Sequence, residues 1–283
     1  LPKHDQTSTA PSQYGVKVIA EITTNHFGDM DRLKSMIVAA KQAGADYIKL
    51  QKRAYELMAG QKGGIIMMDP RDGSILAFVS TPSYDPNIFV RGVTGKEYSG
   101  LLKDPARPLI NRISQGGYSP ASTVKPLLSV MGLNEGAITP TYRYFGGPTF
   151  QIPGTARKFR DWRKGGHGWL DVYRAIEVSA DTFFYDMAYR VGIDKIHDYM
   201  TRFGFGQYSG LDIEEESKGI LPSREWKQKR HRQPWFQGDT ISVGIGQGYW
   251  TATLIQLARA HSILTQHGRI ITPHLGMAFG SGD

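Results

Sequence analysis

Residues 118–126 read YSPASTVKP and carry an S-x-x-K pair, Ser122 and Lys125, ahead of an apolar helical pattern. Side chains three positions apart share one face of a helix, so we expect the Lys125 amine within hydrogen-bonding distance of the Ser122 hydroxyl. A serine becomes a strong nucleophile when an adjacent base takes its proton, and lysine acts as that base where burial lowers its pKa. The stretch therefore predicts a nucleophilic serine at a helix start. Alone, the pair is a weak signal and more often marks a helix-capping serine beside an exposed lysine.

A second motif, a triplet downstream of the S-x-x-K pair, favours the nucleophilic serine over the helix cap. Ser179 and Asp181 belong to the sequence SAD within the mixed apolar stretch IEVSADTFFY, downstream of Ser122. An S-x-x-K pair followed by a triplet of this kind is the signature of penicillin-recognising serine enzymes, in which the triplet usually ends in Asn. We expect the Asp181 carboxylate to hold either the Lys125 ammonium or a serine hydroxyl.

The composition narrows the chemistry. The chain has 283 residues, a formal net charge of +8 and no cysteine, which excludes a thiol nucleophile, disulfides and Cys-based metal sites. Hydrophobic residues make up 40% and charged residues 21%, values typical of a globular protein. No apolar run approaches the length of a membrane span, so we expect a soluble chain that lacks a membrane anchor.

Basic side chains gather in two stretches of the sequence. Such clusters bind anionic partners or form a solvated surface, and no nucleic-acid motif accompanies either one, so we expect a surface and no nucleic-acid partner. The clusters consist of Arg157, Lys158, Arg160, Arg163 and Lys164, and of Arg224, Lys227, Lys229, Arg230 and Arg232.

The order of the patterns predicts a mixed fold. Residues 1–15 read as a flexible leader, and residues 16–53 as a β-α-β segment with strands at 16–20 and 47–50. An antiparallel hairpin follows, with strands at 65–68 and 75–79 around the turn DPRDG. We expect a long loop over 81–117 and then helical segments near Ser122, over 172–189 and over 253–264.

Longer runs carry a family resemblance. From about residue 50 to 274 the chain resembles the transpeptidase domain of the penicillin-binding protein 2 family, the peptidoglycan D,D-transpeptidases of cell-wall elongation. The resemblance rests on MDPRDGSILAFVSTPSYDPNIFV, STVKP, RDWRKGGHG, SADTFFYDMAYRVGID, REWKQKR and PWFQGDTISVGIGQGYWTAT. It implies an α/β (α+β) core in which an antiparallel sheet is flanked by helices, with residues 54–283 as a partial transpeptidase domain.

The resemblance also implies roles for particular residues. Ser122 would be the acylated nucleophile, Lys125 its base, and Ser179 with Asp181 a proton relay. Residues 244–248 would open a helix beside the cleft, and the implied substrate-binding residues are Gly246, Gln247, Gly248 and Trp250. The implied partners are peptidoglycan stem peptides, β-lactams and cell-wall elongation proteins at the periplasmic face of the inner membrane. No cofactor or metal is implied.

The third signature of the family, K-T-G or K-S-G, does not occur in the sequence. The nearest tripeptides, at Lys62 and Lys164, read KGG and lack the hydroxyl. The family carries this motif on a strand further along the chain. We therefore expect a chain truncated before that strand, with an incomplete sheet, which can be inactive as a transpeptidase as it stands.

Residues 16–52 resemble a different family, the sialic-acid synthases, which condense phosphoenolpyruvate with an amino sugar. One β-α-β step of an eight-step barrel is present, so that site cannot assemble and the chain reads as a chimera joined near residues 50–53. Turn and cap roles also fit Asn25 and His26. The residues matched to that family's site are Glu21, Asn25, His26 and Lys49 or Lys52.

Two further interpretations stay open. His167 and Asp161, within DWRKGGHG, offer only two candidate metal ligands, which favours structural or substrate-facing roles. The alternatives to a transpeptidase are a phosphoenolpyruvate-dependent synthase fragment and a non-catalytic scaffold.

Overall fold

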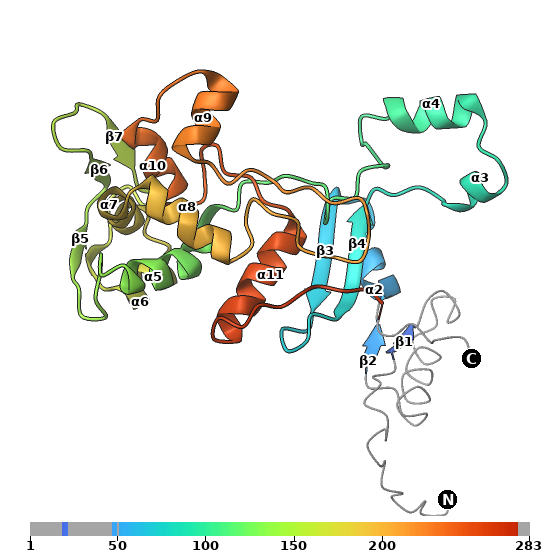
Figure 1. The fold of residues 1–283 in the computed structure, drawn as a ribbon, viewed down its shortest axis with the longest axis horizontal. Helices are drawn as coiled ribbons and strands as arrows, with labels where there is room; N and C mark the ends of the chain where they lie inside the picture. The colour runs from blue at the N-terminus through green and yellow to red at the C-terminus, as the bar shows by residue number, and fades with distance from the viewer. Residues whose placement is uncertain (1–18, 22–46, 50, 277–283) are drawn as a thin grey trace, which may run out of the picture. The chain divides into compact units, whose positions relative to one another are not determined.

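The computed structural model describes residues 19–21, 47–49 and 51–276 (Figure 1). The chain divides into two compact units. Within the described residues, unit 1 comprises those up to Ile113 together with Gly210–Asp212 and those from Pro273 on, and unit 2 comprises Ser114–Ser209 and Ile213–Thr272. The elements of unit 1 are β1 (Ile19–Glu21), β2 (Tyr47–Lys49), α2 (Gln51–Leu57), β3 (Gly63–Met68), β4 (Ile75–Thr81), α3 (Asn87–Val90) and α4 (Gly95–Lys103).

Unit 2 contains the S-x-x-K and SAD sequences. Its helices are η2 (Ala121–Val124), α5 (Lys125–Asn134), α6 (Val172–Glu177), α7 (Asp181–Val191), α8 (Ile193–Arg202), α9 (Arg224–His231), α10 (Gln237–Val243) and α11 (Leu254–Thr265). Its strands are β5 (Tyr144–Gly146), β6 (Thr149–Gln151), β7 (Lys158–Arg160) and β8 (Gly168–Leu170).

The predicted hairpin is confirmed. Strands β3 and β4 pair antiparallel, and alternate residues of β4 are buried as a period of two requires. In the turn, the Asp69 carboxylate accepts the Arg71 N–H, and Gly73 adopts a φ of 89°, which glycine tolerates without steric cost. Residues 65–79 therefore fold as their local sequence dictates.

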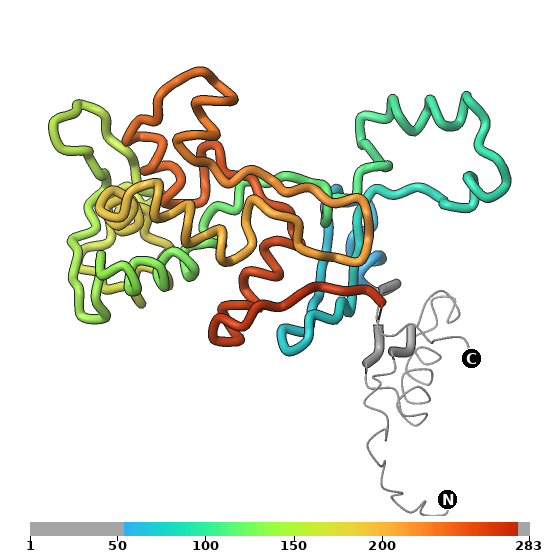
Figure 2. The backbone as a smooth tube through the Cα atoms, in the orientation of Figure 1, coloured from blue at the N-terminus to red at the C-terminus, as the bar shows by residue number. Residues whose placement is uncertain are grey.

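The expected loop over 81–117 contains two helices, so that prediction is wrong in part. Helix α4 begins with a capping box in which Thr94 and Glu97 satisfy each other's backbone N–H groups. Neither α3 nor α4 buries a residue, and for this reason no apolar periodicity in the sequence predicted them. In Figure 2 this segment runs out from the end of β4 and returns.

The two strands of the N-terminal segment pair in parallel, as predicted, with Ile19 opposite Tyr47. The described strand residues are Ile19–Glu21 and Tyr47–Lys49, and residues 16–18 and 50 of the predicted strands lie outside the described residues. The leader, the helix expected between the strands, Asn25 and His26 lie outside the described residues.

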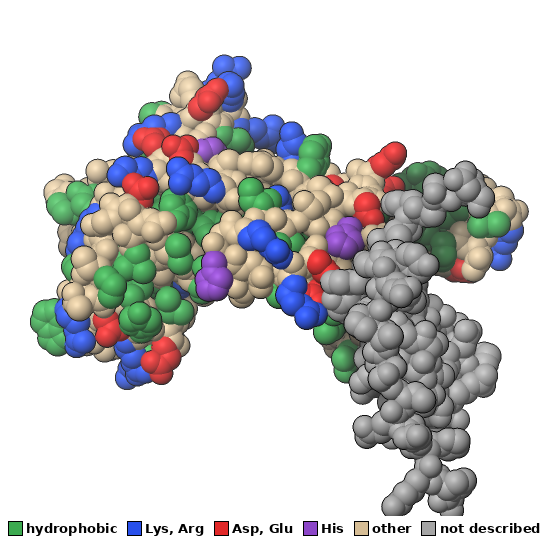
Figure 3. Space-filling view, turned by 60° about the horizontal axis from the view of Figure 1, so that its bottom comes forward, with side chains coloured by type: hydrophobic (Ala, Val, Ile, Leu, Met, Phe, Trp, Pro, Cys, Tyr) green, Lys and Arg blue, Asp and Glu red, His purple; other side chains and the backbone are tan. Residues whose placement is uncertain are grey.

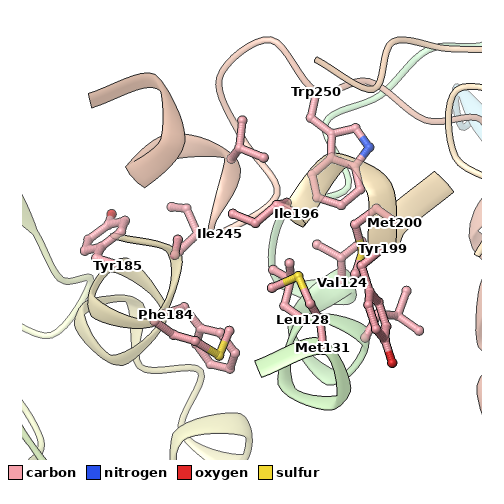
Figure 4. Close-up of a cluster of buried hydrophobic side chains, with 14 of the residues drawn as sticks. Val124, Leu128, Met131, Phe184, Tyr185, Ile196, Tyr199, Met200, Ile245 and Trp250 are labelled. Atoms are coloured by element: carbon pink, nitrogen blue, oxygen red, sulfur yellow. The ribbon is translucent and has the colours of Figure 1, made fainter. Parts of the chain in front are cut away.

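Helix α7 is central to unit 2 and packs against helices α5, α8 and α10 and strands β5, β6 and β7. The core is made of aliphatic and aromatic side chains, with Leu128, Met131 and Phe184 fully buried (Figure 4). Burial of this kind contributes about 1.5–3 kcal/mol per large side chain. The short ribbons β5–β8 and β6–β7 are both antiparallel. Unit 2 therefore holds its candidate site residues on helices that share one core, or, for Ser179, in the turn between two of them.

The helix expected over 172–189 is interrupted, which corrects the prediction. Helix α6 ends at Glu177, and α7 starts at Asp181. Between them Ser179 adopts a φ of 53°, a left-handed conformation that ends a right-handed helix. The apolar periodicity continues through the break, so the sequence pattern concealed it.

Candidate active site

The two residues of the S-x-x-K pair differ in exposure. Ser122 lies in the single turn of η2 and is exposed, whereas Lys125 opens α5 and is 1% exposed. Pro126 is accommodated in the first turn of α5, where a backbone N–H would have no partner within the helix. The local sequence therefore buries the amine beneath an exposed hydroxyl.

Ser179 connects these two side chains. Its Oγ donates to Ser122 Oγ at 2.9 Å, and Lys125 Nζ donates to Ser179 Oγ at 3.1 Å and to the Ser179 carbonyl oxygen at 2.9 Å. Among the described residues, the amine has no direct hydrogen bond to the Ser122 hydroxyl. The expected direct contact is replaced by a chain of three polar side chains.

Asp181 completes this chain. Its Oδ1 lies 2.6 Å from Lys125 Nζ, and the Phe184 ring centroid lies 5.2 Å from the same nitrogen. Burial lowers the pKa of Lys125 below its ordinary value, while the hydrogen bond and charge of Asp181 oppose that shift. An amine with a lowered pKa is neutral in a larger fraction of molecules near neutral pH, and only the neutral amine can accept a proton.

A glycine packs against the backbone of the turn that carries Ser122. The Ala121 N–H, next to Ser122, donates to the Gly246 carbonyl oxygen at 2.8 Å, and Ala121 itself has a φ of 49°. Gly246 is buried with a φ of 68°, and a Cβ there would lie 2.7 Å from the Ala121 nitrogen. Only glycine fits this approach. Gly246 therefore lies against the backbone that precedes the serine.

The other residues expected to bind substrate lie in different surroundings. Gln247 and Gly248 are exposed, whereas Trp250 is 0% exposed and lies among buried hydrophobic side chains (Figure 4). The Phe205 ring meets the Trp250 ring edge-on, with the ring centroids 5.1 Å apart. Trp250 belongs to the core, because its rings fill the space among apolar side chains. The expected helix opening at 244–248 is also wrong, since α10 ends at Val243.

Asp161 and His167 form a buried pair, with His167 Nε2 2.9 Å from Asp161 Oδ1. The other carboxylate oxygen of Asp161 accepts the Thr182 N–H at 3.0 Å, which satisfies an open donor at the start of α7. Burial raises the pKa of Asp161, but the N–H groups of Thr182 and Arg163 and the contact with His167 outweigh it, so the pKa lies below its ordinary value. No cluster of three metal-ligating side chains occurs in the described part of the chain.

Sequence reasoning missed three contributors to the site: Trp162, Thr182 and Phe184. Trp162 Nε1 donates to the Val178 carbonyl oxygen at 3.1 Å. No spacing rule relates residue 162 to residue 178, because β8 and α6 lie between them in the sequence and the fold brings the two residues together. The exposed position of Trp162 also gave no periodic signal.

The basic clusters are in part neutralised. Arg224 contacts Asp194 at 3.0 Å, and Lys229 pairs with Glu225 one helical turn away. On the face shown in Figure 3, Lys and Arg side chains are spread among acidic, hydrophobic and neutral ones. The described residues contain no helix with the length and apolarity needed to cross a bilayer.

Unit 2 thus presents a serine, a second serine and a buried lysine in one hydrogen-bonded chain, the arrangement of an acyl-transferring serine enzyme. The model of the penicillin binding protein transpeptidase domain matches residues 63–280, and the chain belongs to this family.

Relatives within the family are named for one activity. The chain is 49% identical to the peptidoglycan D,D-transpeptidase MrdA of Escherichia coli strain K12 over 91% of its own length. It is 54% identical to MrdA of Salmonella typhimurium strain LT2 over 83% of its length. It spans 41% and 38% of these two relatives.

Solved structures agree on the fold. Pseudomonas aeruginosa PBP2 in complex with WCK 5153 is 46% identical, with a TM-score of 0.78 over 83% of this chain and 52% of that one. PBP2 in its complex with MreC from Helicobacter pylori is 35% identical, with a TM-score of 0.76 over 83% of this chain and 43% of that one. The α/β transpeptidase fold predicted from the sequence is confirmed.

Proposed function

We propose that this chain carries the acyl-transfer site of a peptidoglycan D,D-transpeptidase, with Ser122 as nucleophile. The observation that carries the proposal is the chain of hydrogen bonds from Ser122 through Ser179 to the buried Lys125. The identity to MrdA proteins supports the substrate class, stem peptides that end in D-Ala-D-Ala.

In the first half-reaction, Ser122 Oγ attacks the carbonyl carbon of the penultimate D-Ala. Both hydroxyls rotate so that the directions of the two hydrogen bonds reverse. The Ser122 proton then moves to Ser179 Oγ, whose own proton moves to the neutral Lys125 amine. When the tetrahedral intermediate collapses, the C–N bond breaks and the departing D-Ala takes a proton back along the same path. An ester between substrate and Ser122 remains.

In the second half-reaction, an amine of a neighbouring stem peptide attacks this ester. The amine loses a proton to the same relay as the new amide forms, and Ser122 leaves as a hydroxyl. β-Lactams would acylate Ser122 by the first half-reaction, because their strained amide imitates D-Ala-D-Ala. The acyl group would then remain, since water is a poorly supported acceptor.

We extend the proposal to the protein's surroundings. Stem peptides, β-lactams and cell-wall elongation proteins are the expected partners, at the periplasmic face of the inner membrane. The support is the pairing of a Helicobacter pylori PBP2 with MreC and the ligand bound to a Pseudomonas aeruginosa PBP2.

We also propose that residues 16–52 have a separate origin, related to the sialic-acid synthases. The support is that the sequence runs carrying the transpeptidase resemblance all lie after residue 52, and that the transpeptidase family model matches from residue 63 on. Sequencing of the parent genome tests this: a second gene with the same segment before further βα steps supports it, and native continuity with a complete transpeptidase gene contradicts it.

The proposed activity is tested with a synthetic peptide that ends in D-Ala-D-Ala, supplied with and without an amine acceptor. We expect D-Ala release and an amide product with the wild-type chain and none with Ser122→Ala. Ser262→Ala is the matched control, because the Ser262 hydroxyl donates only within its own helix, to the Ala258 carbonyl oxygen. D-Ala release by Ser122→Ala at the wild-type rate would overturn the proposal.

A further inference from the structure

The turn from Val178 to Ala180 holds Ser179 in a backbone conformation that non-glycine residues seldom adopt. Its φ is 53°. Such conformations persist where the surrounding structure enforces them, and they are frequent at reacting sites. In this conformation Ser179 Oγ lies within hydrogen-bonding distance of both Ser122 Oγ and Lys125 Nζ. The contacts that hold the turn therefore also set the geometry of the relay.

One dipeptide contacts the chain on both sides of this turn. Before Ser179, the Val178 carbonyl oxygen accepts the indole N–H of Trp162 at 3.1 Å. After it, Asp161 Oδ2 accepts the Thr182 N–H at 3.0 Å and the Thr182 hydroxyl at 3.2 Å. Asp161 and Trp162 therefore bracket the turn.

The dipeptide is itself fixed in place. The Asp161 N–H donates to the Pro148 carbonyl oxygen at 3.0 Å, and Asp161 Oδ1 accepts the Arg163 N–H at 3.0 Å. The His167 ring lies 2.9 Å from Asp161 Oδ1 through its Nε2 and 5.5 Å from the Trp162 ring centroid. These contacts restrict the positions that both side chains can take.

Burial of apolar surface does not account for Trp162, because the residue is 63% exposed. Its one polar atom makes the bond to Val178, and its ring packs on His167. Trp169 is equally exposed at 63% and contacts Phe145 through its ring, with no side-chain hydrogen bond within the described residues. The two tryptophans are thus equally exposed, but only Trp162 donates an indole hydrogen bond to the backbone within the described residues.

We propose that Trp162 and Asp161 are positioning residues for acyl transfer: they hold Ser179 in its left-handed conformation, which keeps its hydroxyl between Ser122 and Lys125. This inference rests on the proposed function and deepens it. Neither residue exchanges a proton with the substrate. Each acts through the backbone of the turn.

The first test is Trp162→Phe, which keeps an aromatic ring over His167 and removes the N–H. With a fluorescent penicillin, we expect the acylation rate constant to fall about 10- to 100-fold, while the concentration for half-saturation and the final labelled fraction stay unchanged. Trp169→Phe is the matched control, and its rate constant should match that of the wild type. A reduced labelled fraction at an unchanged rate constant would mean partial unfolding and would contradict the inference.

A double-mutant comparison isolates the route through Ser179. In a Ser179→Ala background, Trp162→Phe should have no additional effect on the rate constant, because the hydroxyl it positions is gone. An equal loss in both backgrounds would overturn the inference. Thr182→Val should slow acylation in the same way, and Thr182→Ser, which keeps the hydroxyl bonded to Asp161, should restore it.

Failure of the proposed function is distinguishable from failure of this inference. If the wild-type chain forms no penicillin adduct, the proposed function fails, and crystal structures of the wild type and of Trp162→Phe decide the inference. Loss of the positive φ at Ser179 in the variant, with its hydroxyl outside hydrogen-bonding distance of Ser122, supports it. An unchanged Ser179 contradicts it.

Discussion

Two lysines of unit 2 are buried to the same extent, and only one of them belongs to the candidate site. Lys125 and Lys227 are each 1% exposed, and each forms an ion pair with an aspartate in the first turn of a helix. The aspartates are Asp181 of α7 and Asp239 of α10. A buried lysine paired with an aspartate is therefore not by itself a sign of catalysis.

Their surroundings differ in one respect. Lys125 Nζ also donates to the hydroxyl of Ser179, which leads to an exposed serine. Both ammonium groups lie near aromatic rings, but among the described residues Lys227 Nζ has no hydroxyl partner, and the ring centroids of Phe236 and Tyr249 lie 4.4 and 5.5 Å from it. Rings stabilise the ammonium form and offer no proton to exchange. The hydroxyl neighbours of Lys125, rather than its burial, therefore make it a candidate base.

Removal of the base is expected to have the largest effect. Lys125→Met should lower the rate constant for acylation by a fluorescent penicillin about 10²- to 10⁴-fold, because no neutral amine then accepts the proton of Ser122. Stopped-flow labelling measures the rate, and thermal melting reports the folded fraction. If Lys227→Met slowed acylation equally at full labelling, the distinction between the two lysines would be wrong.

Removal of the Ser179 hydroxyl eliminates the feature that distinguishes the surroundings of Lys125 from those of Lys227. Ser179→Ala leaves the Lys125–Asp181 ion pair in place and interrupts the path to Ser122, so we expect acylation to slow about 10- to 100-fold. Rapid-quench labelling measures this loss. Ser262→Ala should acylate at the wild-type rate. An unchanged rate constant in Ser179→Ala would show that the amine reaches Ser122 without a relay.

The aspartate tunes the base, and its effect appears in the pH dependence. Burial lowers the pKa of Lys125 and Asp181 raises it, so acylation should increase with pH as the amine becomes neutral. Asp181→Asn removes the negative charge, which lowers the pKa of Lys125 further and moves the ascending limb of the pH–rate profile to lower pH. A limb displaced to higher pH would contradict this assignment.

The smallest effect on acylation is expected at the second lysine. Lys227→Met leaves Asp239, whose side chain is 19% exposed, without its cation and should reduce the free energy of unfolding by about 1–3 kcal/mol. Urea denaturation measures the loss. Acylation of the folded protein should stay within about twofold of the wild type, since the two lysines share no partner.

Local patterns predicted local structure well. The hairpin at 65–79 has alternating strands and turn residues that specify it, and the S-x-x-K pair lies at a helix start because its spacing and Pro126 favour one. The family runs predicted the transpeptidase fold. In these cases the determining residues are close together in the sequence.

The missed features depend on contacts between distant segments. The apolar pattern over 172–189 continues through the break at Ser179, and the contacts beside that break come from residues 161 and 162. The core position of Trp250 likewise depends on Phe205. Such features depend on how the helices pack around α7, and residue spacing along the sequence does not predict that packing.

The proposed function requires that Ser122 is the residue acylated. Intact-mass analysis of the 283-residue chain after incubation with a penicillin, followed by peptide mapping, tests it most directly. We predict one adduct of the mass of the intact penicillin on the peptide that contains Ser122, and no adduct on Ser122→Ala. An adduct that persists in Ser122→Ala, or that maps to another residue, would contradict the claim.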